Sequence, residues 1–128
     1  MNSFNENHES DQLFYKGVNT FNNGQFYDAH EILEELWSEY KLHDRIFIQG
    51  LIQVSVAFYH LQNNNLNGTK SMLKKALKKI DCKNARISNL PITIKSLNDI
   101  LITINLIKTN KEFDWSLIPK LLIKEDDR

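Results

Sequence analysis

The amino-acid sequence predicts an all-α protein, a compact bundle of about five to six helices around one central apolar helix. Apolar residues recur at steps of three and four along most of the chain, which is the period of an amphipathic helix rather than of a strand. No Gly- or Pro-rich linker interrupts this pattern, and a chain of 128 residues is long enough for one core and too short for two. We therefore expect a single helical domain over residues 1–128, with residues 1–8 as a disordered tail.

The first two predicted helices follow one another closely. The first runs from about Glu9 to Asn22, and Asn23-Gly24 supplies the left-handed residue that ends it. Its inward positions are Leu13, Phe14, Gly17, Val18 and Phe21. The second helix covers roughly Gln25 to Tyr40. Its apolar positions, again three and four residues apart, are Phe26, Ala29, Leu33, Leu36, Trp37 and Tyr40.

The third predicted helix is the central one. It runs from Arg45 to Gln62, with Asp44 as its N-cap, and it is apolar around most of its circumference. Because the loop before it is short, we expect it to pack antiparallel on helix 25–40. Gly50 would let these two backbones approach closely.

The fourth predicted helix is rich in lysine. Asn63 to Asn65 ends the third helix, and Asn67 or Thr69 opens the fourth, which reaches about Ile80. The basic residues are Lys70, Lys74, Lys75, Lys78 and Lys79, with Lys83 and Arg86 beyond them. No aromatic residues are interleaved with these lysines to stack on bases, so we interpret them as a solvated outer face and do not expect nucleic-acid binding.

Two proline-marked segments complete the chain. Pro91 suits the first turn of a fifth helix from Ile92 to Lys108. Pro119 interrupts the last segment, so we expect a turn plus a short docking helix within residues 114–123.

Charge and composition exclude several classes of protein. The 16 basic and 16 acidic side chains cancel, so no net field attracts nucleic acid or an anionic membrane. The apolar runs are short and the first residues lack the features of a signal peptide, so we expect a cytoplasmic protein without a membrane segment. Cys82 is the single cysteine, which excludes an internal disulfide.

The second helix carries a histidine and several carboxylates at the margin of the core. His30 and Glu34 lie four residues apart and share a helical face, and Glu31 and Glu35 form a second such pair beside them. Arg45, at the start of the next helix, is placed to form a bidentate ion pair with one of these glutamates, Glu31, Glu34 or Glu35.

The third helix carries a matching polar stripe of Gln49, Gln53 and His60, in steps of four and seven. Burying such groups unpaired costs about 1 to 3 kcal/mol each, so the two helices should supply each other's hydrogen-bond partners. We call this predicted interface the polar seam. Its members are His30, Glu31, Glu34, Glu35, Trp37, Arg45, Gln49, Gln53 and His60.

The order and spacing of these residues resemble the family catalogued as domain of unknown function 309, found in bacteria and the plastid lineage. The shared pattern is an aromatic-rich turn, His-Glu-x-x-Glu and a Trp, then Arg, Gln-Gly and a helix ending in His. The matching residues are Phe26, His30, Glu31, Glu34, Trp37, Arg45, Gln49, Gly50, Ala57 and His60, followed by Asn65 and Gly68. The resemblance spans Phe14 to Leu77. It implies an all-α bundle, and members of the family are labelled predicted metal-dependent hydrolases.

The polar seam has a structural and a catalytic interpretation. In the structural one, its groups form a hydrogen-bonded network and no cofactor is expected. In the catalytic one, His30, Glu34 and His60 hold a divalent metal such as Zn²⁺ or Fe²⁺, and Glu31 acts as general base of a metal-dependent hydrolase. The sequence lacks His-Glu-x-x-His, so it does not match the zincin motif.

A binding or interaction module with a protein or peptide partner is the main functional expectation. Two helical hairpins with Asn-rich turns recur about forty residues apart and would stack into an interaction scaffold, although a repeat array needs more copies. Exposed aromatic residues separate the two functions. A groove rimmed by Tyr27, Tyr40 and Tyr59 favours binding, whereas a closed pocket around His30 and His60 favours chemistry.

Overall fold

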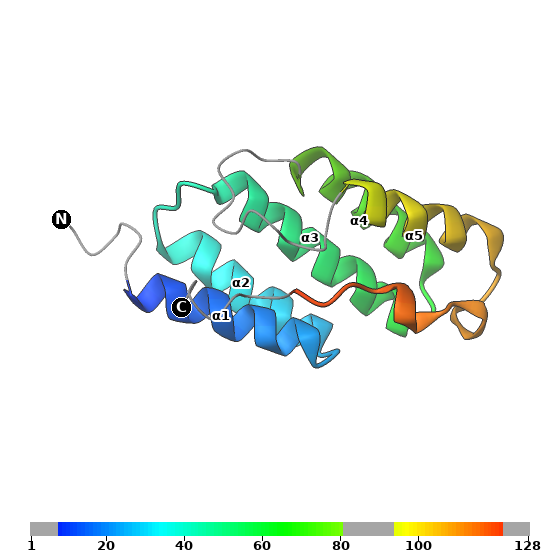
Figure 1. Ribbon diagram of the computed structural model, residues 1–128, viewed down its shortest axis with the longest axis horizontal. Helices are drawn as coiled ribbons and strands as arrows, with labels where there is room; N and C mark the ends of the chain where they lie inside the picture. The colour runs from blue at the N-terminus through cyan, green and yellow to red at the C-terminus, as the bar shows by residue number, and fades with distance from the viewer. Residues whose placement is uncertain (1–7, 81–93, 122–128) are drawn as a thin grey trace.

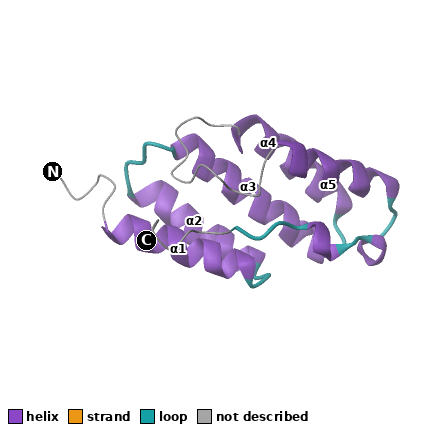
Figure 2. Ribbon diagram, in the orientation of Figure 1, coloured by secondary structure: helices purple, strands orange, loops and turns teal. Residues whose placement is uncertain are grey.

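The computed structural model describes residues 8–80 and 94–121, and this part of the chain is all-helical (Figures 1 and 2). Five α-helices come first, and two single turns of 3₁₀-helix follow. They are α1 (His8–Asn22), α2 (Phe26–Glu39), α3 (Arg45–Gln62), α4 (Leu66–Ile80), α5 (Ile94–Leu106), η1 (Asn110–Glu112) and η2 (Trp115–Leu117). The predicted all-α class is confirmed, and none of the described helices is long and apolar enough to cross a membrane.

Several sequence-based expectations fall on residues outside the described part of the chain. These are residues 1–7 of the predicted tail, Pro91 and the predicted start of the fifth helix, Cys82, Lys83, Arg86, and residues 122–123 of the last segment. His8, also assigned to the tail, is instead the first residue of α1.

The helices pack in the order in which they occur along the chain. Helix α1 packs on α2, α2 on α3, α3 on α4, and α4 on α5 (Figure 1). Helix α3 therefore lies between α2 and α4, and it runs antiparallel to α2, as its sequence predicts. Because neighbours on both sides cover α3, its circumference can be almost entirely apolar without exposing a large hydrophobic patch.

Aromatic rings fill the core where the first three helices meet. The Phe21 and Phe26 ring centroids are 5.0 Å apart, and Phe58 of α3 lies 5.9 Å from the first ring and 5.4 Å from the second. All three side chains are buried. Each such side chain removes a large apolar surface from water, so this cluster fixes α1 and α2 against α3.

Asparagine and glycine residues set the turns between helices. Gly24 has φ +80°, the left-handed conformation that ends α1 as predicted. The Asn65 side chain accepts a hydrogen bond from the Gly68 N–H at 2.9 Å, so Asn65 caps α4, and the predicted opening at Asn67 or Thr69 was wrong. Asp44 does occupy the N-cap position of α3, but its buried side chain makes no capping hydrogen bond.

The close helix approach predicted at Gly50 occurs with a different partner. A Cβ at Gly50 would lie 3.0 Å from Ile80 and 3.2 Å from Lys79, so this glycine accommodates α4 and not α2. The tight contact with α2 is instead made by Gly17 of α1, where a Cβ would lie 2.8 Å from Cδ2 of Leu33. A glycine brings helices together wherever the facing side chain is bulky, and the sequence alone does not name that side chain.

The C-terminal segment is an extended strap across the bundle, not the short docking helix predicted from the sequence. One 3₁₀ turn at η2 is followed by extended chain to Leu121, because Pro119 has no N–H with which to continue a helix. Asn22 holds the strap: its Nδ2 donates to Leu121 O at 2.8 Å, and its Oδ1 accepts from Leu121 N at 2.7 Å. Buried Phe113 and Leu121 anchor the two ends of the strap.

The Gly17 contact predicts a destabilising substitution. We expect Gly17→Ala to lower the free energy of unfolding by about 1 to 3 kcal/mol, because the new methyl group would overlap the fully buried Leu33 side chain. Chemical denaturation measures the change. Asn19→Ala, at an exposed position of the same helix, is the matched control and should stay within about 0.5 kcal/mol of wild type. Equal effects of the two substitutions would contradict the proposed contact.

The hydrogen bonds accepted by the Glu112 carboxylate predict that it contributes to the free energy of unfolding in a pH-dependent way. The backbone N–H groups of Lys108 and Thr109 donate to its Oε2 at 2.7 and 3.0 Å and hold the pKa of this carboxyl below its ordinary value of 4.5. A carboxyl whose pKa is lowered by folding stabilises the fold above its unfolded pKa, and this contribution disappears as the pH falls through the folded pKa.

Wild type should therefore melt at a higher temperature than Glu112→Gln at neutral pH, because Gln cannot carry the charge. The gap should close as the pH falls below 4.5. Melting curves of both proteins over that range check this, and a gap that does not depend on pH would sink the explanation.

Candidate functional site

An open pocket of about 250 Å³ lies between α2, α3 and α4, and we call it the seam groove. It is lined by His30, Glu34, Trp37, Gln49, Ile52, Gln53, Val56 and Met72. Its polar lining residues all belong to the predicted polar seam, so the structure brings together the central part of that prediction. Positions 49, 52, 53 and 56 of α3 recur at steps of three and four, which is why a single helix face forms the floor.

The α2 wall of the seam groove presents two acceptors side by side. Nδ1 of His30 lies 2.7 Å from Tyr27 O, and because a carbonyl only accepts, this nitrogen must donate. Nε2, which faces Glu34 Oε1 at 3.5 Å, is then an acceptor in the neutral imidazole. The His30 side chain is 17% exposed and that of Glu34 is 59% exposed, so the imidazole is held in the wall and the carboxylate stands on the rim.

Trp37 contributes a buried donor. Its Nε1 has no access to solvent and no hydrogen-bond partner in the described part of the chain. Trp37 Nε1 is therefore the least satisfied polar group of the groove. Leaving such a buried donor without a partner costs about 1 to 3 kcal/mol. The ring is fixed by Arg45, whose guanidinium carbon lies 3.9 Å from the indole centroid.

Arg45 does not form the ion pair predicted for it. Its Nη1 donates to the backbone carbonyls of Trp37 at 2.6 Å and Tyr40 at 3.4 Å, and no ion pair with a glutamate of α2 is found among the described residues. The reason is position: the start of α3 lies beside the end of α2, where unpaired carbonyls need donors. Arg45 thus closes the C-terminus of α2 and stacks on its last aromatic residue.

The two glutamines of the floor differ in their bonding. Gln53 Oε1 accepts from Lys79 Nζ of α4 at 3.2 Å, so this amide has the partner that its position predicts, although from α4 and not from α2. Gln49 makes no hydrogen bond with any other described side chain or backbone group. Lys79 was interpreted as part of a solvated face, and this was wrong because its stem is half-buried over α3.

His60 lies away from the seam groove, at the turn between α3 and α4. Its Nδ1 is 3.3 Å from Nδ2 of Asn65, and a Cβ at Gly68 would lie 2.8 Å from its Cγ. Gly68 therefore leaves room for the imidazole, and Asn65 both contacts it and caps α4. The motif residues His60, Asn65 and Gly68 have a structural explanation as one turn.

The predicted metal-ligand set is not assembled. His30 and Glu34 meet, but His60 does not line the groove, and in residues 8–80 and 94–121 no three His, Cys, Asp or Glu side chains are grouped to hold a metal ion. Glu31, the candidate general base, and Glu35 are exposed on α2 outside the groove. The metal-dependent hydrolase alternative stays a prediction.

Only part of the predicted aromatic rim exists. Tyr27 is 46% exposed, and its ring centroid lies 5.1 Å from that of Tyr59 and 5.0 Å from that of His30. Both tyrosines therefore lie beside the His30 end of the seam groove, although neither lines it. Tyr40 lies elsewhere, where its hydroxyl donates to Glu9 at 3.3 Å. Partial desolvation and the Glu9 carboxylate raise the pKa of Tyr40.

Sequence reasoning missed the apolar lining of the groove, Ile52, Val56 and Met72. Ile52 and Val56 fall within the helix that the sequence predicts to be apolar around most of its circumference, and Met72 falls within the predicted lysine-rich helix. Their spacing relative to Gln49 and Gln53 is the signal that could have placed them on the same face.

The fold and the groove define a small all-α bundle protein with an open polar groove between consecutive helices. Residues 14–72 match the model of the family described as Domain of unknown function (DUF309). This segment runs from within α1 into α4 and contains all of the groove-lining residues. The resemblance to this family, predicted from the motif residues, is thereby confirmed.

Two relatives of the chain are themselves described only as uncharacterized. A protein of Aquifex aeolicus (strain VF5) is 33% identical over 67 residues, which cover 52% of this chain and 20% of the relative. The protein YpuF of Bacillus subtilis (strain 168) is 31% identical over 67 residues, which cover 51% of this chain and 38% of the relative. The match thus spans well under half the length of both relatives. No solved structure matches the chain.

The Arg45 contacts predict which α2 residues matter for stability. We expect Arg45→Lys to cost about 1 kcal/mol in the free energy of unfolding, because lysine keeps the charge but loses the planar stacking on Trp37 and the forked donors. Glu31→Gln and Glu35→Gln should stay within about 0.5 kcal/mol of wild type in the same urea titration. A loss in either glutamine variant as large as that of Arg45→Lys would restore the ion-pair explanation.

Proposed function

We propose that this protein is a binding module that takes a protein or peptide partner in the seam groove. The observation that carries the proposal is the buried Nε1 of Trp37, which has no hydrogen-bond partner among the described residues. The half-buried Gln49 amide beside it is likewise unpaired within residues 8–80 and 94–121. Polar groups buried in a stable fold are normally paired, so a buried donor left unmatched at an open groove points to a ligand that supplies the missing acceptor.

The remaining walls supply contacts of other kinds. Ile52, Val56 and Met72 offer an apolar surface, and methionine adapts its shape to different ligand groups. Tyr27 and Tyr59 lie beside the groove with partly exposed rings, a residue type enriched in protein interfaces. The volume of about 250 Å³ lies below the usual range for enclosed small-molecule sites, which favours a partner that continues beyond the pocket.

Access to the Trp37 indole depends on the side chains that cover it. Trp37 Nε1 is covered by its neighbours, so an acceptor reaches it only when a lining side chain moves. The Gln49 side chain has no hydrogen-bond partner in the described part of the chain, and the Glu34 side chain is 59% exposed, so both can rotate at small cost. The cytoplasmic location expected from the sequence stays a prediction.

Selection from a phage-displayed library of random peptides tests the proposal. Peptides that bind wild type should bind Trp37→Phe and Gln49→Ala at least about tenfold more weakly, because each substitution removes a groove hydrogen-bonding group. Ile102→Ala, at a 59% exposed position of α5, is the control and should leave the affinity unchanged.

The indole N–H resonance gives a direct readout. Trp115→Phe identifies the Trp37 signal, which should shift on addition of a selected peptide, since a new acceptor changes the environment of Nε1. A library that yields no binder, or binders equally sensitive to Ile102→Ala, would contradict a site in the seam groove.

A further inference from the structure

Building on the proposed function, we infer that the seam groove binds an extended peptide segment in which a basic residue stands next to an acidic one. The basic side chain lies against the α2 wall and the acidic side chain against the α4 wall. The main chain runs along α3, over Gln49 and Gln53.

The α2 wall selects a cation because its accessible groups are acceptors. In the neutral imidazole, His30 Nδ1 donates to Tyr27 O and Nε2 is an acceptor that faces the Glu34 carboxylate at 3.5 Å. Two adjacent acceptors are satisfied together by one group with several N–H donors. A lysine ammonium or an arginine guanidinium is such a group, and its charge complements Glu34.

The α4 wall has the opposite character. Lys79 donates to Gln53 at 3.2 Å and keeps further N–H donors, since an ammonium carries three. Lys75 lies on the same helix face, three residues from Met72 and four from Lys79, and is exposed. Neither lysine is among the lining residues, but Lys79 bonds to the lining residue Gln53, and Lys75 is a helical neighbour of the lining residue Met72. A carboxylate therefore stands on the α2 side of the groove and ammonium groups lie beside its α4 side, and the two attract side chains of opposite sign.

An extended chain fits this charge arrangement and a helix does not. Successive side chains of an extended segment point to opposite sides, so neighbouring basic and acidic residues reach opposite walls at the same time. The N–H and C=O groups of an extended chain are also unpaired, and they can meet the Gln49 amide and the Trp37 indole. The backbone groups of a helical ligand are already bonded internally and would leave these partners unmatched.

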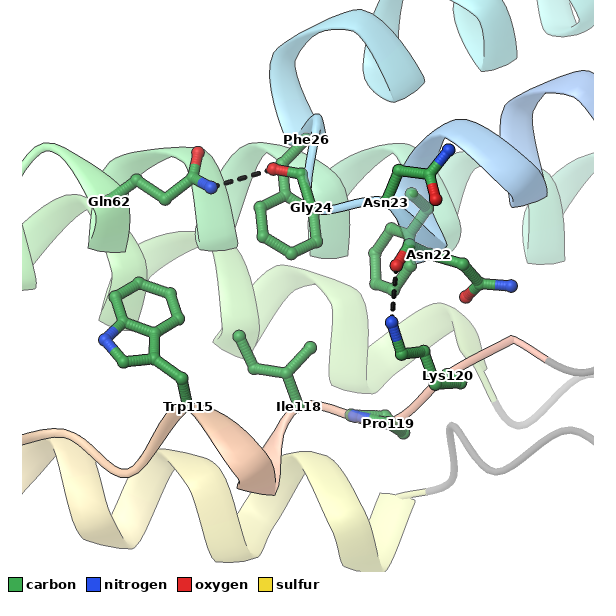
Figure 3. Close-up of a pocket in the computed structure, with 10 residues that line it drawn as sticks. Asn22, Asn23, Gly24, Phe26, Gln62, Trp115, Ile118, Pro119 and Lys120 are labelled. Atoms are coloured by element: carbon green, nitrogen blue, oxygen red, sulfur yellow. Dashed lines mark hydrogen bonds between the residues drawn. The ribbon is translucent and has the colours of Figure 1, made fainter.

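The bundle already holds one extended segment in this way. At the α1–α2 turn, the Asn22 amide makes two hydrogen bonds to the main chain of Leu121, at 2.7 and 2.8 Å. The neighbouring Lys120 donates from Nζ to Asn22 O at 2.6 Å, and Figure 3 shows this contact beside Ile118 and Pro119 of the strap. This molecule therefore holds an extended segment through a helix-borne amide that bonds to its main chain and a helix-end carbonyl that accepts from its lysine. The Gln49 amide offers the same donor and acceptor on α3, and Gln53, whose Oε1 accepts from Lys79, offers its N–H donors.

Two short fluorescein-labelled peptides of identical composition test the inference with the full chain. In one, lysine and glutamate alternate around a central leucine. In the other, the lysines and the glutamates form separate blocks, so that each wall meets both charges. Fluorescence anisotropy should show the alternating peptide binding at least about tenfold more tightly, with the difference lost in high salt.

Matched substitutions locate the contacts. Glu34→Gln and Lys75→Gln should each weaken the alternating peptide several-fold. Glu35→Gln and Lys74→Gln, which remove the same charges from neighbouring exposed positions on other faces of α2 and α4, should not. Circular dichroism confirms that each variant is folded.

The outcomes separate this inference from the proposed function. Equal binding of the two peptides, tighter binding of the blocked one, or no binding of either overturns the extended, charge-alternating ligand. The proposed function is decided independently by the random-peptide selection, and library binders that become helical in the groove would uphold it while rejecting this inference.

Discussion

The burial of α3 between α2 and α4 is the constraint on which the rest of the structure depends. A helix that is apolar around most of its circumference is stable in water only when neighbours cover it on several sides. Helices α2 and α4 do so, and the Phe21–Phe26–Phe58 cluster brings α1 into the same core. A strip of α3 that α2 and α4 cover only in part carries Gln49 and Gln53, and it becomes the floor of the seam groove.

Hydrogen bonds at the helix ends fix how the bundle closes. Arg45 satisfies carbonyls at the end of α2 and stacks on Trp37, so one side chain both ends a helix and holds the wall of the groove. At the opposite end of α3, Gln62 donates to Gly24 O at 2.8 Å, and Asn110 donates to Leu61 O at 2.9 Å (Figure 3 draws the first of these bonds). These hydrogen bonds hold together turns that are distant in sequence, and they do so between groups that carry no charge.

The family motif divides into structural and site residues. Arg45 closes α2, and His60 belongs to the α3–α4 turn, where it explains the need for glycine at position 68. His30 and Gln49 of the same motif line the groove. A set of residues that looks like one cluster in sequence is thus two separate arrangements, about three helical turns apart along α3.

The sequence by itself determined the helices, since local periodicity, glycine stops and prolines act over a few residues: α3 begins and ends where its pattern predicts. It also placed His30, Glu34, Trp37, Gln49 and Gln53 on facing helices. Only the tertiary structure decided which side chains meet. The carbonyls at the end of α2 claim Arg45, and α4, not α2, fills the space beside Gly50. Such choices depend on the relative rotation of packed helices, which is set by the whole core and not by the spacing within one helix.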